Sequence, residues 1–88
     1  MSAMDKKKIM ELRGRAQSLQ ATAHVGKDGI TEESAEEIKD QLKRNKLVKV
    51  RLLQSAGEDR DEIALQLARK TSSTLVEVRG RTVVLARD

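Results

Sequence analysis

The chain of 88 residues carries 18 Lys and Arg against 14 Asp and Glu, a formal net charge of +4, and has no cysteine and no aromatic residue. A chain of this length is one domain with room for one layer of helices on one sheet; the missing cysteines exclude disulfides and cysteine-ligated zinc, and the missing aromatics exclude base stacking on Phe, Tyr or Trp. The positive excess is uneven, because residues 1–57 carry a net +4 and residues 58–88 a net zero, so a basic binding surface should draw mainly on the first half.

The first predicted element is a helix over residues 6–19, preceded by residues 1–5, which we expect to be flexible. Apolar residues recur along it at helical spacing and form one stripe of Ile9, Leu12, Ala16 and Leu19. Basic residues flank the stripe, Lys6 and Arg13 on one side and Lys8 and Arg15 on the other, while Lys7 points outward. In isolation the three lysines would only mark a solvated helix end. Together with Arg13 and Arg15 they predict a strip that binds phosphate.

A short strand over residues 22–25 leads to the tetrad Gly26-Lys27-Asp28-Gly29. A second helix is predicted over residues 31–44, with an apolar face of Ala35, Ile38 and Leu42. Thr31 suits the N-cap of this helix, and acidic residues follow in its first turn, where they complement the helix dipole.

The tetrad has two interpretations. Most Gly-x-x-Gly segments are turns, because glycine tolerates positive φ. A binding loop is the alternative, since Lys27 supplies a cation, Gly26 and Gly29 would let a sugar–phosphate backbone come close, and the N–H groups at the following helix start would point toward the loop. Asp28 opposes this interpretation unless its carboxylate turns aside, and it is also a residue that accepts unusual turn dihedrals. KH domains clamp nucleic acid with a GxxG loop between two helices, whereas a strand is predicted before the loop here.

The second half predicts one strand, one helix and a hairpin. Residues 47–54 alternate apolar and basic side chains, as in a half-buried strand. After a turn at 55–57, a helix begins at Glu58 or Asp59, where Asp59 and Glu62 have the spacing of a capping box. Strands over 74–79 and 81–87 meet at Gly80, close enough for an antiparallel hairpin. The order α-β-α-β-α-β-β requires crossovers, so part of the sheet is parallel.

Three segments combine recognisable motifs: LRGRAQSLQATAHVGKDGIT (12–31), LVKVRLL (47–53) and LARKTSSTLVEVRGRTVVLAR (67–87). Together they resemble the CRM domain, the family of chloroplast RNA splicing and ribosome maturation proteins with its stand-alone YhbY-like members. The resemblance covers nearly the whole chain and rests on the basic first helix, the GKxG-hydrophobic-Thr loop and the closing V-x-G-R-T-V-V-L pattern. In this sequence Ala21 replaces a usual proline, Ala86 an aromatic residue, and Thr71-Ser72 a Thr-Gly pair.

The resemblance implies a single compact α/β domain over residues 1–88. Its mixed four-stranded sheet would be packed by helices, in a shape like the C-terminal domain of translation initiation factor three. The resemblance also implies an RNA-binding protein that contacts structured RNA, in particular ribosomal RNA in precursors of the large ribosomal subunit. The family's loop maps onto Gly26, Lys27, Asp28 and Gly29, and its basic first helix onto the cations from Lys6 to Arg15.

Two other function classes stay open: a small basic α/β protein that binds DNA in chromatin, and an adaptor domain that binds no nucleic acid. We do not expect an enzyme, because no motif places a nucleophile near His24, the single histidine. Acids at helix starts explain the carboxylate clusters without a metal, so neither a metal site nor a cofactor is expected. We expect a cytoplasmic protein without membrane contact, because no apolar run approaches the about 20 residues of a membrane span and the first ten residues do not resemble a signal peptide. We also expect a monomer.

Overall fold

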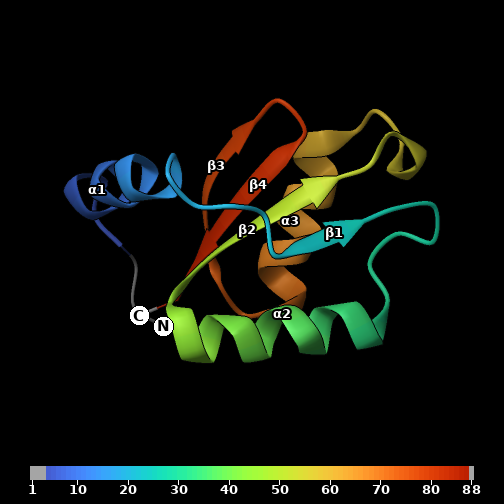
Figure 1. The fold of residues 1–88 in the computed structure, drawn as a ribbon, viewed down its shortest axis with the longest axis horizontal. Helices are drawn as coiled ribbons and strands as arrows, with labels where there is room; N and C mark the ends of the chain where they lie inside the picture. Colours follow the sequence, from blue (N-terminus) through green and yellow to red (C-terminus); the bar gives the residue numbers. More distant parts are fainter. Residues whose placement is uncertain (1–3, 88) are drawn as a thin grey trace.

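A computed structural model describes residues 4–87 and gives seven elements of regular structure and one short 3₁₀ turn (Figure 1). In chain order they are α1 (Lys6–Ala16), β1 (Ala23–Val25), α2 (Glu32–Asn45), β2 (Leu47–Leu52), the turn η1 (Gln54–Ala56), α3 (Arg60–Lys70), β3 (Thr74–Arg79) and β4 (Thr82–Ala86). The predicted order of helices and strands is therefore confirmed, as is the single α/β domain with a mixed sheet.

The four strands form one sheet in the order β1-β2-β4-β3. β1 runs parallel to β2, with Ala23 beside Val50, whereas β4 is antiparallel to both of its neighbours. The parallel pair follows from the crossover through α2, and the antiparallel pair β3–β4 follows from the tight hairpin at Gly80, where φ is +56°. β2 and β4 are the two central strands, and they carry the most fully buried side chains.

Side chains on the two faces of the sheet join different apolar clusters. On one face, α2 and α3 cover ten buried residues: Val25, Ile38, Leu42, Val48, Val50, Leu52, Ala64, Leu67, Val83 and Leu85. On the other face, α1 covers a smaller cluster, made of Leu12, Ala16, Leu47, Val76, Val84 and Ala86. The expectation of one layer of helices on one sheet is thus wrong in one respect. The apolar stripe of α1 is buried separately, against apolar side chains at one end of the sheet face opposite α2 and α3.

Helix α1 is shorter than predicted, because it ends at Ala16 instead of Leu19. The carbonyl groups of Ala16 and Leu19 both accept hydrogen bonds from Nζ of Lys49, at 3.1 Å each. The Lys49 ammonium group thus replaces the backbone N–H groups that would bond to these carbonyls if the helix continued. After this point the chain turns away toward β1. Leu19 leaves the apolar stripe as a result and is 39% exposed.

The helix starts follow the sequence closely. Thr31 caps α2 and forms a reciprocal capping box with Ser34, and the carboxylate of Asp59 caps α3 by accepting from the N–H of Glu62 at 3.3 Å. Asp5 caps α1 by accepting from the N–H of Lys8 at 2.8 Å, and Met4 packs against the smaller cluster. Of the stretch expected to be flexible, residues 1–3 lie outside the described residues.

The remaining differences are small shifts of strand and helix ends. β1 begins at Ala23, β2 ends at Leu52, and Arg81 belongs to the hairpin turn instead of the last strand. Helix α2 extends to Asn45, one residue further than predicted. Helical spacing predicts a buried face of α3 made of Ile63, Ala64, Leu67, Ala68 and Thr71. Leu65 lies off that face and is 44% exposed.

Helix α3 ends in a left-handed residue that is not glycine. Ser72 has φ +54°, and the backbone N–H of Ser73 returns to the carbonyl of Ala68 at 2.9 Å. This is the usual place for glycine after a helix, because a Cβ is disfavoured in the left-handed region. The Thr71-Ser72 departure from the family's Thr-Gly pair therefore leaves a strained position.

We predict that Ser72→Gly stabilises the protein by about 0.5–1 kcal/mol, since relief of the left-handed strain outweighs the greater freedom of glycine in the unfolded chain. Urea unfolding measures this difference. Ser73→Gly is the matched control and should destabilise, because Ser73 has no positive φ and its hydroxyl contacts that of Thr71 at 2.8 Å. Equal effects of the two substitutions would contradict the strain at Ser72.

Candidate nucleic-acid interface

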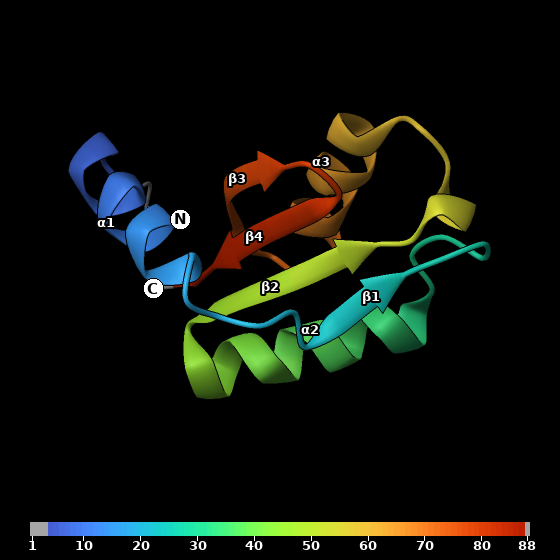
Figure 2. The same cartoon turned by 45° about the horizontal axis from the view of Figure 1, so that its top comes forward.

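The two regions predicted to bind RNA lie at opposite ends of the molecule. Helix α1 stands at one end of the longest dimension, which spans 34 Å, and the loop of Gly26 to Gly29 projects at the other (Figures 1 and 2). The fold therefore does not bring the basic helix and the tetrad into contact. What lies between them decides whether they can serve one ligand.

The tetrad is a tight turn. The N–H of Gly29 donates to the carbonyl of Gly26 at 3.0 Å, and the two glycines form an isolated antiparallel bridge with Lys27 and Asp28 at the tip. Both side chains at the tip are exposed. The turn interpretation is thus correct as geometry, and it presents the Lys27 ammonium group to solvent at the end of the sheet.

Each glycine of the tetrad has a structural reason. Gly29 has φ +69°, which any other residue would adopt with strain. Gly26 lies against the segment that follows β2, where an added Cβ would come within 3.2 Å of Leu53 Cδ1 and 3.4 Å of Ser55 Oγ. The φ angle of Gly29 and the contacts at Gly26 explain both glycines without a ligand, so the case for binding at this loop depends on Lys27.

The start of α2 offers fewer donors to an anion than the sequence predicted. Its capping box pairs the N–H of Thr31 with Ser34 Oγ and the N–H of Ser34 with Thr31 Oγ1, both at 3.0 Å. The carboxylates of Glu32 and Glu33 also stand in the first turn. The helix start is therefore partly capped by its own side chains and carries two carboxylates, which makes it poorly suited to hold a phosphate.

The basic residues of α1 separate into two environments. Arg13 donates from Nε to the carbonyl of Val76 in β3 at 3.3 Å. One of its N–H groups therefore helps to hold α1 on the sheet. Lys8 forms an exposed ion pair with Glu11 at 3.8 Å. Lys8 and Arg15 also line a cavity of about 360 Å³ together with Lys46 and Arg87. The Lys8 and Arg15 flank is thus the one that joins other cations.

The sheet face beside α1 carries a group of polar side chains that were not predicted from the sequence as part of the site. We call this the open sheet face; it consists of His24, Lys49, Arg51, Glu77, Arg79 and Thr82. Their placement follows from the pairing register: His24 lies beside Arg51, Arg51 beside Thr82, Thr82 beside Arg79, and Lys49 and Glu77 flank Val84. One row of paired residues thus crosses all four strands, and the backbones of Arg51 and Arg79 are two strand spacings apart, about 10 Å.

These side chains are accessible. His24, Arg51 and Arg79 are exposed, and Arg79 forms an ion pair with Glu77 at 3.7 Å. A depression of about 260 Å³, lined by Lys49, Arg79 and Thr82 among others, lies on this face next to the end of α1. The open sheet face therefore connects α1 at one end with the tetrad at the other. The alternation of residues 47–54 was the sequence signal for it, because basic residues alternating with core residues must share one face.

Arg81 holds the far end of this surface together. Its guanidinium donates to the carbonyls of Leu52, Leu53 and Gly57 at 2.9, 2.7 and 2.9 Å. The N–H of Leu53 in turn donates to the carbonyl of Val25 at 2.8 Å. Arg81 therefore fixes the segment on which Gly26 packs, and its charge is directed at the protein backbone.

The opposite side of the molecule has the opposite charge near the tetrad. Acidic residues gather in the N-terminal halves of the two helices on that side: Glu32, Glu33, Glu36 and Glu37 in α2, and Asp61 and Glu62 in α3 after Glu58 and Asp59. A polyanion approaching the molecule is repelled there and attracted to the open sheet face.

Comparison with known proteins identifies the family. Residues 4–87 match the CRS1/YhbY (CRM) domain. The chain belongs to this family. It is 34% identical over 77 residues to "Probable RNA-binding protein YqeI" of Bacillus subtilis, covering 88% of this chain and 80% of that protein. It is 37% identical over 78 residues to "Probable RNA-binding protein MJ0652" of Methanocaldococcus jannaschii, covering 86% of this chain and 58% of that protein.

The fold of the CRM domain is also found in a solved relative. The solution structure of SAV1595 from Staphylococcus aureus, described as a candidate RNA-binding protein, superimposes with a TM-score of 0.84 at 34% identity, covering 98% of this chain and 90% of that chain. The resemblance inferred from the three sequence segments is thus confirmed at the level of both family and fold.

No helix within residues 4–87 is long and apolar enough to cross a membrane. No group of three or more His, Cys, Asp or Glu side chains within this range could hold a metal ion.

Proposed function

We propose that this CRM-domain protein binds structured RNA across the open sheet face, with α1 at one end of the contact and the tetrad at the other. The observation that carries the proposal is the row of exposed His24, Arg51 and Arg79 side chains across the sheet, which connects the two regions. The names of the relatives YqeI and MJ0652 support RNA as the ligand.

The chemistry of this surface favours contacts to the sugar–phosphate backbone. Arginine and lysine neutralise phosphates and release counterions, which gives affinity that falls as salt rises. Because the chain has no Phe, Tyr or Trp, stacking on these rings cannot contribute. RNA recognition on the open sheet face should therefore depend mainly on the spacing of phosphates in a folded RNA.

The double substitution Arg51→Ala and Arg79→Ala tests the open sheet face. Loss of two phosphate contacts should weaken binding to a structured RNA by about 2 kcal/mol, roughly 30-fold, and lower the salt slope by about two. Fluorescence anisotropy titrations at several salt concentrations measure both quantities.

The matched control for this test is Arg69→Ala with Lys70→Ala, which removes the same charge from exposed positions on α3, the helix on the opposite face. It should change affinity far less. Equal losses from the two double variants would show that net charge alone attracts RNA and would contradict the proposed surface.

Lys27→Ala tests the tetrad without disturbing its backbone. Removal of one phosphate contact should weaken RNA binding by roughly 1 kcal/mol and lower the salt slope by about one. Thermal stability should stay within about 0.5 kcal/mol, because Lys27 is exposed. Gly29→Ala is a poorer probe, since it strains the turn whatever the RNA does. Parent-like affinity of Lys27→Ala at moderate salt would restrict the tetrad to its role as a turn.

We further propose, from the family resemblance, that the RNA is ribosomal RNA in precursors of the large ribosomal subunit and that the protein works in the cytoplasm as a monomer. In a sucrose gradient of cell extract at low salt, the protein should sediment with particles lighter than the mature ribosome. Raising the salt concentration should release the protein from these particles, as expected when Lys and Arg side chains contact RNA phosphates. Recovery only at the top of the low-salt gradient would contradict the ribosomal proposal and leave RNA binding itself standing.

A further inference from the structure

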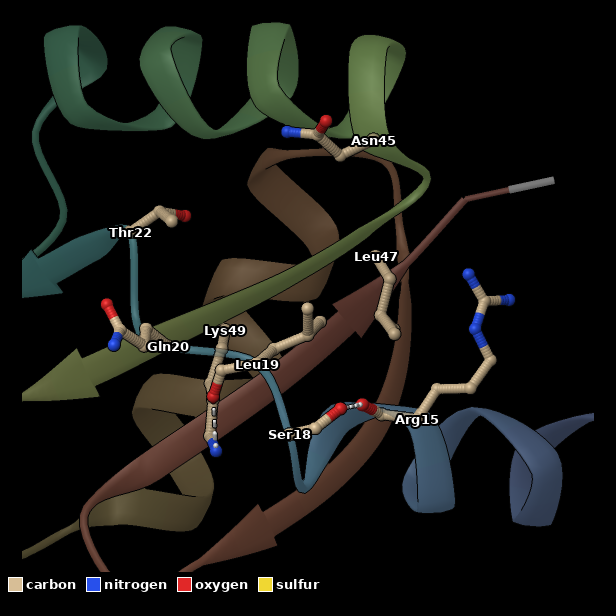
Figure 3. A pocket seen from close by; sticks show the side chains of 8 residues that line it. All are labelled: Arg15, Ser18, Leu19, Gln20, Thr22, Asn45, Leu47 and Lys49. Carbon is tan, nitrogen blue, oxygen red and sulfur yellow. Dashed lines mark hydrogen bonds between the residues drawn. The ribbon is translucent and has the colours of Figure 1, made fainter.

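A cavity of about 500 Å³ opens between the end of α1, the linker of residues 17–22, the end of α2 and the first half of β2 (Figure 3). Its lining includes Arg15, Leu19, Gln20, Asn45, Leu47 and Lys49. This volume lies within the range of about 300–1,000 Å³ that is typical of small-molecule sites in proteins. The cavity lies outside the open sheet face, which it meets only at Lys49.

The strand register creates the cavity. β1 begins to pair with β2 only at Ala23 beside Val50, after a last contact from the N–H of Thr22 to the carbonyl of Lys49 at 3.0 Å. The start of β2 therefore has no strand beside it on this side. The linker passes there instead, at a distance set by the hydrogen bonds from Lys49 Nζ to Ala16 and Leu19. The space is thus a consequence of fixed backbone geometry.

The lining combines apolar and amide groups. Leu47, which is 6% exposed, and Leu19 supply apolar surface. The side-chain amides of Gln20 and Asn45 are exposed and make no hydrogen bond to any other residue that the structure describes. A primary amide carries a donor and an acceptor side by side, the arrangement that matches the edge of a nucleobase.

Cations border the cavity on the side of the chain termini. Arg15, Asn45 and Leu47 also line the neighbouring cavity of about 360 Å³, whose walls include Lys8 and Arg87. Arg15 and Arg87 are exposed. These two guanidinium groups beside an amide-lined apolar space match the chemistry of a nucleotide, with an anionic phosphate joined to a flat, hydrogen-bonding base.

We propose that this junction binds one unpaired nucleotide of the RNA. The base lies in the larger cavity against Leu19 and Leu47, its edge pairs with the amides of Gln20 and Asn45, and its phosphate contacts Arg15. The proposal rests on the proposed function and adds to it a site that reads an unpaired base, where the open sheet face contacts only the backbone. It also gives a means of recognising unpaired bases to a protein that has no Phe, Tyr or Trp on which to stack them.

The test uses the double variant Gln20→Ala and Asn45→Ala, which removes both amides and no charge. Two RNAs of equal length serve as probes: a hairpin with unpaired loop nucleotides and a fully paired duplex. Affinity of the variant for the hairpin should fall about tenfold, while affinity for the duplex and the salt slope should not change. Gln66→Ala, an exposed amide on α3, is the matched control and should bind both RNAs like the parent.

A second measurement does not depend on the variant. A hairpin with 2-aminopurine at single unpaired positions should brighten at one position when the parent protein binds, because the base leaves its stack, and should not brighten with the double variant. Unchanged fluorescence at every position, or equal losses for hairpin and duplex, would overturn the nucleotide site while backbone-driven RNA binding stands. Failure of the parent to bind either RNA would overturn both proposals.

Discussion

The alternation of side chains along β2 is the constraint on which the rest of the molecule depends. Val48, Val50 and Leu52 point to one face and enter the larger core beneath α2 and α3. Successive side chains on a strand point to opposite faces, so Lys49 and Arg51 must lie on the other. One strand at the centre of the sheet thus builds the core and the basic surface at the same time. A shift of its register by one residue would bury two cations and expose the core, which fixes the pairing strongly.

Lys49 shows how a charged residue can organise the fold as well as a surface. Its ammonium group donates hydrogen bonds to the carbonyl of Ala16 at the end of α1 and to that of Leu19 in the linker. These bonds fix where the helix stops and where the linker runs. The same residue borders the depression on the open sheet face and the cavity beside the linker. The length of α1, the shape of the cavity and the position of the basic surface are therefore linked through one side chain.

The charges of the molecule are unevenly distributed over its surface, although their net excess is small. The net charge of +4 is modest, but the helix side near the tetrad is acidic and the open sheet face is basic. Such a distribution orients a polyanion before contact, because the electrostatic potential is positive over the basic face and negative over the acidic region. Glu77 partly neutralises the open sheet face through its ion pair with Arg79. Arg51 forms no ion pair among residues 4–87 and keeps its full charge on this face.

Local sequence patterns determined the elements, their order and most helix caps. Thr31 and Asp59 were identifiable as caps because capping depends on residues within three positions, and the core faces of α2 and α3 followed from helical spacing. The tetrad, too, was identifiable as a turn, and the cations of α1 as a strip. Only the tertiary structure decided that α1 ends at Ala16, that Gly26 is needed for contact with Leu53, and that the two predicted binding regions lie at opposite ends. It also decided that Lys49, Arg51, His24 and Arg79 share one surface. Those features arise where segments distant in the chain meet, and the side chain that meets a given backbone group depends on strand order and register, which local periodicity does not encode.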